Sequence, residues 1–374
     1  MNVLVLGGAG NQGRGVSRLL AGTDLVTELI VAGRRLEAAD QVAAQLGEKA
    51  RAAQVDVHDE PRLRTLMAGC DLVVQAGGPH FEVLVPTVRA ALQAGVHVCD
   101  VSDGGRSIRR ALALDAEARA AGITGLIGVG LSPGLTNLLA LHAYRQLDRV
   151  EDLEICWVNN GPLNSWRGAT LLSLLDSASG VVPTFGDGTW VDIVGHEHGV
   201  DVTLPGGGTV HVYPSGFPEP VTLPRSLPGL RSVSHLVGYL PERVGDLFAD
   251  HVRQVAAGQC TVAAAQDRFC TACAAEPAAA TAAVPAVPAF TWYVRASGTK
   301  AGRRARLTCT SPLTSTEASL VAAALKLLRG DITQRGVLAP EACLEPQSFF
   351  RDVAALLPES RRPADGALIA ERWD

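Results

Sequence analysis

A glycine-rich segment, Gly8-Ala-Gly10-Asn11-Gln12-Gly13, directly follows an apolar run and opens an amphipathic one. Its spacing, G-x-G-x-x-G, binds the pyrophosphate of a dinucleotide when it joins a strand to a helix. In that setting Gly8 permits the tight turn, Gly10 lets the backbone approach the pyrophosphate, and Gly13 lets the helix pack on the strand. The helix N-terminus adds N–H groups and a positive dipole. We therefore predict that these residues hold a dinucleotide; the alternative is a flexible turn without a ligand.

The end of the second predicted strand indicates which dinucleotide is bound. An NAD-dependent enzyme places Asp or Glu there, on the ribose 2′-hydroxyl. This chain has Gly33, Arg34 and Arg35, which leave space and offer two guanidinium groups to a 2′-phosphate. Two solvated arginines are the alternative, but cations are unfavourable at a helix N-terminus without an anion. The pattern favours NADP over NAD, with these three residues in the binding site.

Two further segments at strand ends are expected to lie beside the cofactor. Asp56 and Val57 close the third predicted strand near the place of the adenine, although Asp56 could equally cap the next helix. Gly77 and Gly78 follow the fourth strand. Their small size would let the backbone lie along the nicotinamide ribose.

His80 and Asp100 are the candidate catalytic residues. Both follow strands whose carboxyl ends form the ligand-binding edge of a parallel sheet. His80 could exchange a proton with the substrate, or could simply be a loop histidine that faces solvent. Asp100 could orient an amine beside Ser102, or could cap the helix that begins near Ser107. The sequence leaves these alternatives open.

The elements that must position these residues alternate between short apolar runs and amphipathic segments. Strands are predicted at 3–6, 29–32, 52–56, 72–75, 97–100 and 123–129. A helix is predicted from Leu36 to Leu46, and Asp59, Glu60 and Pro61 open the next with a cap, an acid and a first-turn proline. Parallel strands need helical cover on both faces, so this pattern predicts an α/β fold with a Rossmann-type, doubly wound parallel sheet.

The pattern changes from about residue 150 onward. Antiparallel strands are predicted at 153–158, 190–194, 200–203 and 209–213, and a hairpin joins 292–295 to 306–309. This part indicates a second, α+β domain. The alanine- and proline-rich segment 256–288 is predicted to be a mobile surface connection. Thr314 and Glu317 form a capping box before a helical run that Gly330 ends.

The composition excludes several classes of protein. Of 374 residues, 47% are hydrophobic and 19% charged, with a net charge of −5. We therefore expect no nucleic-acid partner and no membrane-surface partner, since both attract basic proteins. A strand that begins at Val3 leaves no room for a secretory signal, so we expect a cytoplasmic protein. The eight cysteines lack framework spacing and are expected to be reduced; the pairs Cys270/Cys273 and His196/His198 predict no metal site.

Taken together, these motifs resemble the saccharopine dehydrogenase family in its broad sense, which includes saccharopine reductases, carboxynorspermidine dehydrogenases and lysine 6-dehydrogenases. The similar segments lie at 8–13, 33–35, 78–81, 94–100, 128–137, 219–225 and 336–341. The resemblance implies an NAD(P)-dependent oxidoreductase that moves a hydride between the nicotinamide and a C–N carbon. It would reduce an imine to a secondary amine, or oxidise an amine.

The resemblance also implies how the domains are arranged and where the substrate binds. Residues 1–132 plus 313–374 would form the NADP-binding Rossmann domain, and residues 133–312 an inserted α+β domain for substrate binding and dimerisation. The substrate would be an amino-acid-like or polyamine-like amine with a carbonyl partner, and the enzyme a homodimer. Candidate substrate contacts are Ser102, Asn137, Asn160, Trp166 and Arg167, and Arg225, His235 and Arg295 could each pair with a substrate carboxylate.

Two other functions fit the same motifs. An enoyl reductase of this family would reduce a C=C bond in an apolar cleft, whereas polar residues such as Asn137, Asn160 and Arg167 favour an amine substrate. A regulator that binds NADP without catalysis is the second alternative, because the sequence shows no unmistakable proton donor.

Overall fold

The computed structural model describes residues 1–161, 166–277, 280, 282–284, 287–364 and 366–374. The chain divides into two compact units. Unit 1 comprises Met1–Asp103, Ser107–Leu138 and Pro312–Leu368, and unit 2 comprises Gly104–Arg106, Leu139–Ser311 and Ile369–Asp374. The last six residues thus lie in unit 2, whereas we expected them in the nucleotide-binding part.

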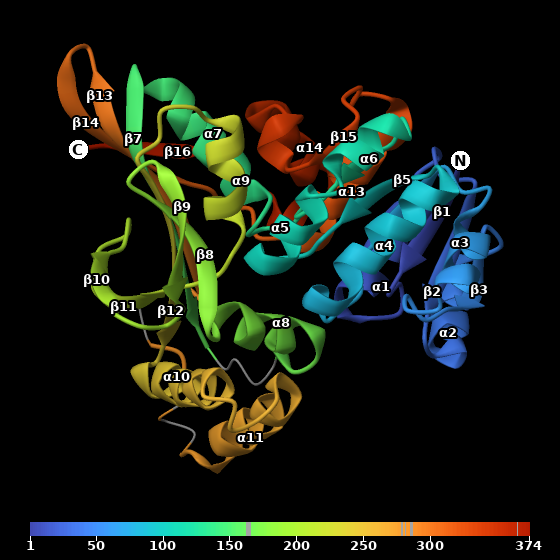
Figure 1. Ribbon diagram of the computed structural model, residues 1–374, viewed down its shortest axis with the longest axis horizontal. Helices are drawn as coiled ribbons and strands as arrows, with labels where there is room; N and C mark the ends of the chain where they lie inside the picture. The colour runs from blue at the N-terminus through green and yellow to red at the C-terminus, as the bar shows by residue number, and fades with distance from the viewer. Residues whose placement is uncertain (162–165, 278–279, 281, 285–286, 365) are drawn as a thin grey trace. The chain divides into compact units, whose positions relative to one another are not determined.

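Unit 1 is built on a seven-stranded sheet in the order β15-β6-β5-β4-β1-β2-β3 (Figure 1). Every pair of neighbouring strands is parallel. The strands are β1 (Asn2–Leu6), β2 (Glu28–Gly33), β3 (Ala50–Gln54), β4 (Leu72–Gln75), β5 (His97–Asp100), β6 (Thr124–Leu126) and β15 (Gly336–Leu338). The predicted Rossmann-type fold is confirmed. Because the chain builds outward from β1 to β3 and then from β4 to β6, the topological switch point lies between β1 and β4.

Helices cover this sheet in two layers. The helices are α1 (Asn11–Ala21), α2 (Leu36–Leu46), α3 (Glu60–Met67), α4 (His80–Ala94), α5 (Gly105–Leu112), α6 (Asp115–Ala120), α13 (Thr316–Arg329) and α14 (Pro346–Leu356). Helix α1 packs against α2 and α13, while α3 packs against α4. Val3 and Val5 of β1 are fully buried, as expected for a central strand covered on both faces.

Several elements of unit 1 differ from the prediction. Strand β3 ends at Gln54, so Asp56 lies beyond it. Strand β6 is only three residues long and pairs with β15, a short strand that was not predicted. The N-cap of α13 is Ser315 rather than Thr314, and its hydroxyl accepts a hydrogen bond from the Ala318 N–H. The helix ends at Gly330 as predicted, since that residue adopts the left-handed conformation.

Unit 2 contains a mixed sheet in the order β10-β11-β12-β7-β13-β14-β16, to which β8 and β9 are attached (Figure 1). The strands are β7 (Arg149–Asn160), β8 (Val181–Gly186), β9 (Thr189–Val194), β10 (Val200–Thr203), β11 (Thr209–Pro214), β12 (Ser232–Leu240), β13 (Phe290–Lys300), β14 (Arg303–Thr310) and β16 (Ala370–Trp373). The hairpin of β13 and β14 confirms the prediction. The predicted strands in β7, β9, β10 and β11 each have an antiparallel neighbour, as expected. Strand β7 also pairs in parallel with β12, a strand that was not predicted.

Helices of unit 2 correct another prediction. They are α8 (Ala169–Ala178), α9 (Glu219–Ser226), α10 (Glu242–Ala256) and α11 (Val262–Ala275); α7 (Leu135–Gln146) begins in unit 1. Residues 262–275 were expected in a mobile connection, but they form a capped helix that packs on α10. Phe248 and Phe269 meet edge to face with ring centroids 5.8 Å apart. Apolar packing of this kind stabilises an alanine-rich helix, which composition alone does not reveal.

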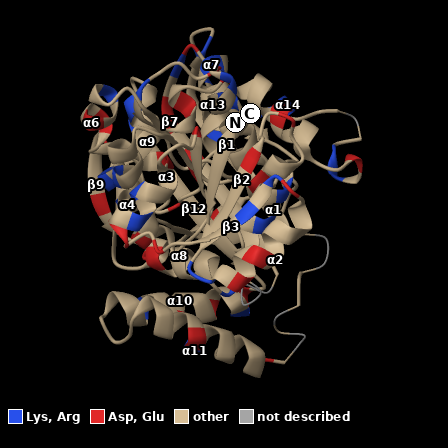
Figure 2. Cartoon of the chain, turned by 90° about the vertical axis from the view of Figure 1, so that its right-hand side faces the viewer, with Lys and Arg blue, Asp and Glu red and all other residues tan. Residues whose placement is uncertain are grey.

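Figure 2 colours the charged residues on the cartoon, and residues of both signs are interspersed along the chain. Among the residues that the structure describes, no helix is long and apolar enough to cross a membrane.

Candidate dinucleotide and proton-transfer site

The glycine-rich turn lies at the carboxyl end of β1, but its tight bend is at Gly7 rather than Gly8. Gly7 has φ +71°, a left-handed conformation that favours glycine. A Cβ on Gly13 would lie 2.0 Å from the Gly7 carbonyl oxygen, so the first turn of α1 packs directly on the bend. Gly10 is the N-cap of α1 and donates its N–H to the same oxygen at 2.8 Å. The role assigned to Gly8 therefore belongs to Gly7.

Gly8 serves instead as a contact between neighbouring strands. Its N–H donates to the Ala32 carbonyl oxygen at 3.1 Å, and a Cβ here would lie 2.9 Å from Val31 Cγ1. The turn is thereby fixed to β2, whose end carries the two arginines.

A pocket opens at the carboxyl ends of β1 to β4, at the topological switch point. Its lining brings together six of the predicted cofactor residues, Gly33, Arg34, Asp56, Val57, Gly77 and Gly78. Gly7 also lines it, a residue that the sequence interpretation missed although two consecutive glycines end β1. Arg35 and residues 8–13 lie outside the lining. In the adjacent first turn of α1, the buried Oε1 of Gln12 accepts no hydrogen bond within the described part of the chain. It is therefore available to accept one from a ligand.

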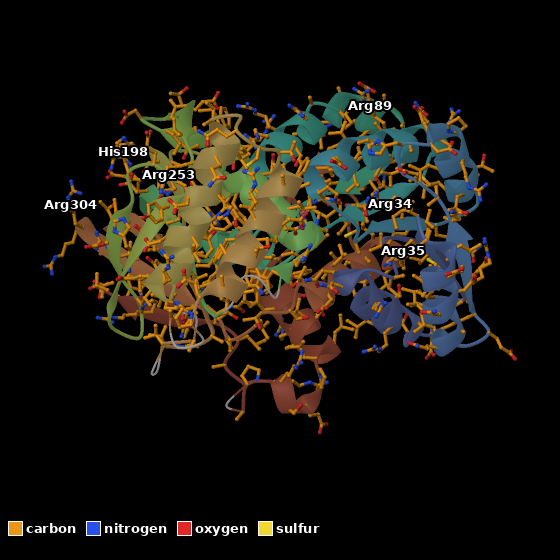
Figure 3. All side chains as sticks on the ribbon, turned by 90° about the horizontal axis from the view of Figure 1, so that it is seen from below. Arg34, Arg35, Arg89, His198, Arg253 and Arg304 are labelled. Carbon is orange, nitrogen blue, oxygen red and sulfur yellow. The ribbon has the colours of Figure 1, made fainter. Side chains whose placement is uncertain are left out.

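The end of β2 provides space and positive charge. A Cβ on Gly33 would meet no atom within 4 Å. Arg34 and Arg35 are exposed, and neither forms an ion pair within the described part of the chain. Figure 3 shows their side chains where the chain passes from β2 to α2. These features fit a 2′-phosphate, which needs room and an unneutralised cation.

Asp56 does not cap the helix that follows it. The N-cap of α3 is Asp59, as predicted, whose carboxylate accepts from the Arg62 N–H at 3.2 Å. Asp56 accepts from the His58 N–H at 3.0 Å and lies in the pocket lining. Of the two readings of Asp56, the helix cap is therefore wrong.

Gln75 locks the turn after β4, a role not seen in the sequence. Its Oε1 accepts from the Gly77 N–H at 2.7 Å, and its Nε2 donates to the Thr87 hydroxyl of α4 at 2.9 Å. The side chain is almost fully buried. It holds Gly77 in the pocket wall and ties that wall to the helix that His80 begins.

His80 is the first residue of α4, and its Nδ1 lies 2.8 Å from Oδ1 of Asp103. The two side chains are only 13% and 17% exposed, so this histidine does not face solvent as a free loop residue. Burial lowers the pKa of His80, but the carboxylates of Asp103 and Asp100 raise it by more, and the net pKa lies above the ordinary value. A carboxylate partner of this kind fixes the orientation of an imidazole.

Asp100 ends β5 with a fully buried carboxylate. Oδ1 accepts from the Ser102 N–H at 2.8 Å, and Oδ2 accepts from the Ser102 hydroxyl at 2.9 Å. Burial raises the pKa of Asp100 to about 6, against the lowering effects of His80 and of hydrogen bonds from Ser102 and Gly128. Asp100 therefore caps its own turn rather than α5. Ser102, a predicted substrate contact, donates its hydroxyl hydrogen bond to this carboxylate.

Asn137 connects two segments of unit 1 that are distant along the chain. Its Oδ1 accepts from the Gly134 N–H at 2.9 Å, and its Nδ2 donates to Oε2 of Glu341 at 2.9 Å. Both side chains are buried. The sequence placed Asn137 among substrate contacts because it could not reveal a partner 204 residues away.

The remaining predicted substrate residues lie in unit 2. Asn160 donates to the carbonyl oxygens of Val284 and Val287 and so holds that part of the chain. Trp166 packs near Trp157 with ring centroids 6.4 Å apart. Arg167 forms an exposed ion pair with Asp267 at 2.6 Å. Residues 162–165 of the predicted polar loop lie outside the described residues.

The three possible carboxylate partners each have neighbours within unit 2. Arg295 pairs with Glu154 at 2.6 Å. Arg225 lies over the Trp190 ring at 5.8 Å. His235 is buried and stacks on Phe217, and burial lowers its pKa.

The cysteine and histidine pairs show no metal-binding geometry. Cys270 and Cys273 are free thiols on α11, and burial raises the pKa of Cys273 to about 11. His196 stacks on Tyr213, and burial lowers its pKa to about 3. Among the described residues, no three His, Cys, Asp or Glu side chains are grouped to hold a metal ion.

A parallel sheet with a glycine-rich turn and a pocket at its switch point defines a Rossmann-type nucleotide-binding fold. Comparison with known families narrows this class: residues 3–126 match the saccharopine dehydrogenase NADP binding domain. The NADP-binding part of the chain thus matches the family that its motifs resemble.

Two curated relatives are similar over part of the chain. Carboxynorspermidine synthase of Vibrio alginolyticus is 23% identical over 253 residues, 60% of each chain. Carboxyaminopropylagmatine dehydrogenase of a Synechocystis species is 26% identical over 171 residues, 43% of this chain and 42% of that one. The matches thus span no more than about three-fifths of the length of these relatives.

Two solved structures share the fold along the whole chain. Apo saccharopine dehydrogenase (L-Glu forming) from Saccharomyces cerevisiae superposes with a TM-score of 0.67 at 15% identity, over 100% of this chain and 99% of that one. A homospermidine synthase from Legionella pneumophila, in complex with NAD, gives 0.60 at 12% identity, over 100% and 91%. At such identities the likeness shows the fold alone.

Proposed function

We propose that the protein is an NADP-dependent oxidoreductase that reduces an imine to a secondary amine, or oxidises such an amine. The observation that carries the proposal is the pocket at the switch point of the parallel sheet. It joins a bend that only glycine fits, an unneutralised arginine and a wall that ends beside His80. The curated relatives are named for carboxylated polyamine chemistry, which supports an amine substrate.

The proposed cofactor preference follows from charge. A 2′-phosphate beside Gly33 would meet Arg34 and Arg35, and charge-assisted hydrogen bonds to a phosphate are among the stronger ones in proteins. A ribose 2′-hydroxyl would find no carboxylate at the end of β2. When bound there, NADPH supplies a hydride to carbon, or NADP⁺ accepts one.

The chain itself must manage the accompanying proton. Reduction of a C=N bond adds a hydride to carbon and a proton to nitrogen. We propose His80 as the group that exchanges this proton, because Asp103 orients its imidazole and the carboxylates of Asp103 and Asp100 raise its pKa, which favours the protonated form. Asp100, buried nearby in the charge field of His80, would favour a cationic nitrogen once ionised.

Binding of the two dinucleotides tests the cofactor assignment. We expect calorimetry to give tighter binding of NADPH than of NADH, and replacement of both Arg34 and Arg35 by alanine to weaken NADPH binding at least tenfold with little change for NADH. Arg64→Ala, an exposed arginine of α3 outside the pocket lining, is the matched control. Equal losses for NADPH and NADH in the double variant would contradict the proposal.

Steady-state turnover tests the reaction. NADPH consumption should require both an amine and a carbonyl compound, and His80→Gln should reduce kcat by about 10²–10⁴-fold, the usual contribution of general acid–base catalysis. Consumption with an enoyl compound alone would favour a C=C reductase. Tight NADPH binding without turnover of any pair would favour a regulator.

A further inference from the structure

Gln75 is the last residue of β4 and the one polar residue of that strand. Its side chain is only 1% exposed. A buried carboxamide is costly unless both its donor and its acceptor are hydrogen-bonded. Both are bonded here: Oε1 accepts from the Gly77 N–H at 2.7 Å, and Nε2 donates to the Thr87 hydroxyl at 2.9 Å. Gln75 therefore joins the turn after β4 to α4 by two directed contacts.

Gly77, the first of these contacts, is confined from two sides. A Cβ on Gly77 would lie 3.1 Å from Oε1 of Gln75 and 3.2 Å from the Cα of Gly7. The preceding residue is fixed as well, because the Ala76 N–H donates to the Leu6 carbonyl oxygen at 2.9 Å. Gly7, Gln75 and Gly77 all line the pocket at the switch point. The Gln75 carboxamide is thus part of the support of this pocket wall.

The second contact of Gln75 is on α4, the helix that His80 begins. Pro86 lies inside α4 and has no N–H, so it donates no hydrogen bond to the Glu82 carbonyl oxygen. The first turn is therefore tied to the rest of the helix by one backbone hydrogen bond fewer. Thr87, which is fully buried, directly follows Pro86 and accepts the hydrogen bond from Gln75. This bond holds α4 to the end of β4 beside the interruption in the helix.

The wall at Gly77 lies on one side of the switch point between β1 and β4. In a doubly wound sheet the two mononucleotide halves of a dinucleotide bind on opposite sides of this point. Gly33, Arg34 and Asp56 follow β2 and β3, so they would bind the adenosine half with its 2′-phosphate. The wall after β4 is left for the nicotinamide half.

We propose that Gln75 is a positioning residue for the nicotinamide half of the cofactor: through Gly77 and Thr87 it fixes the pocket wall and α4 relative to each other. This inference rests on the proposed cofactor, but it assigns a role to a residue outside the glycine-rich turn. All of the contacts that carry it lie within unit 1. Loss of the carboxamide should displace the wall and leave the adenosine end of the pocket intact. Such a displacement matters for hydride transfer, because a shift of about 1 Å in a reacting group can slow a reaction by about 100-fold.

The test compares two ligands by calorimetry with the full chain: NADPH, and adenosine 2′,5′-bisphosphate, which lacks the nicotinamide half. Gln75→Leu should weaken NADPH binding about tenfold and binding of the bisphosphate less than about twofold. Thr87→Val removes the acceptor of Nε2 and should weaken NADPH binding by a smaller factor, whereas Thr87→Ser retains the hydroxyl and should bind NADPH as wild type does. Gln45→Leu, at an exposed glutamine of α2 outside the pocket lining, is the matched control and should change neither Kd.

Hydrogen exchange of the Gly77 amide, followed by NMR without ligand, is the second readout. Exchange should be faster in Gln75→Leu, because the N–H loses its acceptor. Equal losses for both ligands in Gln75→Leu, or an unchanged Kd for NADPH, would overturn the inference. Thermal unfolding identifies a global loss of structure, and the Thr87→Val and Thr87→Ser pair keeps the test decisive if Gln75→Leu fails to fold. Wild-type protein that binds neither ligand would contradict the proposed cofactor; faster Gly77 exchange in Gln75→Leu would then still support the role of Gln75 in the wall, and unchanged exchange would contradict it.

Discussion

A Cβ atom on Gly7 would lie 2.3 Å from the Cα of Gly77, a separation that real side chains do not occupy. The bend after β1 and the turn after β4 therefore meet backbone to backbone, and this contact builds one wall of the pocket at the switch point. The contact thus joins glycines that follow two different strands, whereas the sequence analysis assigned the tight turn to Gly8 alone.

We expect Gly7→Ala to impair both the fold and the cofactor site. The variant must adopt φ +71° with a side chain and must also displace Gly77. Binding of NADPH should weaken at least tenfold in calorimetry, with a lower melting temperature. Gly69→Ala is the control, because Gly69 has φ +85° but open space around its Cβ. It should cost about 1–2 kcal/mol of stability from conformation alone and leave the Kd for NADPH unchanged; equal effects on binding would argue against a special role for Gly7.

Gly33→Asp should reverse the dinucleotide preference. The new side chain has space, since no atom lies within 4 Å of the Cβ position. A carboxylate at the end of β2 can bind a ribose 2′-hydroxyl and repels a 2′-phosphate. We expect the ratio of the Kd values for NADH and NADPH to fall at least tenfold relative to wild type. An unchanged ratio of the two Kd values would show that the ribose 2′-position of the cofactor does not lie at Gly33.

Much of unit 1 follows from its sequence because its signals are local. The strand from Leu72 to Gln75 and the helix from Leu36 to Leu46 have the predicted ends, as apolar runs and flanking glycines specify them directly. The bend at Gly7 was missed because the G-x-G-x-x-G spacing fits only from Gly8, through Gly10 and Gly13. The phosphate turn was thus located, but its register was not.

Side-chain partners could not be predicted when they are distant along the chain. Asn137 meets Glu341, and His80 meets Asp103, through tertiary packing that no spacing reveals. Helix α11 was predicted to be a mobile connection because its segment is rich in alanine and proline. The composition does not show that a few large residues, such as the buried Phe269, pack it against the rest of unit 2. Strand β12 carries a buried histidine and a glycine, which weakened its strand pattern, and its parallel pairing with β7 depends on the connection between them.

The buried carboxyl of Asp100 should give stability a distinctive pH dependence. Its pKa is raised from 3.8 to about 6, so between these values the unfolded chain has released the proton that the folded protein retains. Stability from this group is therefore present at low pH and is lost as pH rises toward about 6. The shift of about two units corresponds to about 3 kcal/mol. Urea unfolding at pH 4 and pH 7 should show Asp100→Asn gaining stability relative to wild type at the higher pH; a gain at the lower pH would contradict the assignment.

Asn137→Leu should destabilise the fold by about 2–4 kcal/mol, because the Gly134 N–H loses its acceptor and the Glu341 carboxylate loses a donor in a buried site. Arg167→Ala breaks an ion pair whose side chains are 62% and 63% exposed, and should cost less than about 1 kcal/mol. Urea unfolding compares the two variants. A small effect of Asn137→Leu on stability combined with a large effect on KM would instead indicate that Asn137 contacts the substrate.

The direct test of the central claim is the fate of the nicotinamide hydrogen. NADPH that carries deuterium at C4 is incubated with the protein, an amine and a carbonyl compound, and the product is analysed by mass spectrometry. We predict one deuterium on the carbon of the new C–N bond and no product when either partner is omitted. With His80→Gln, the labelled product should form much more slowly than with wild type. Deuterium found only in a reduced C=C bond, or NADPH that binds tightly without transferring its label to any amine and carbonyl pair, would contradict the claim.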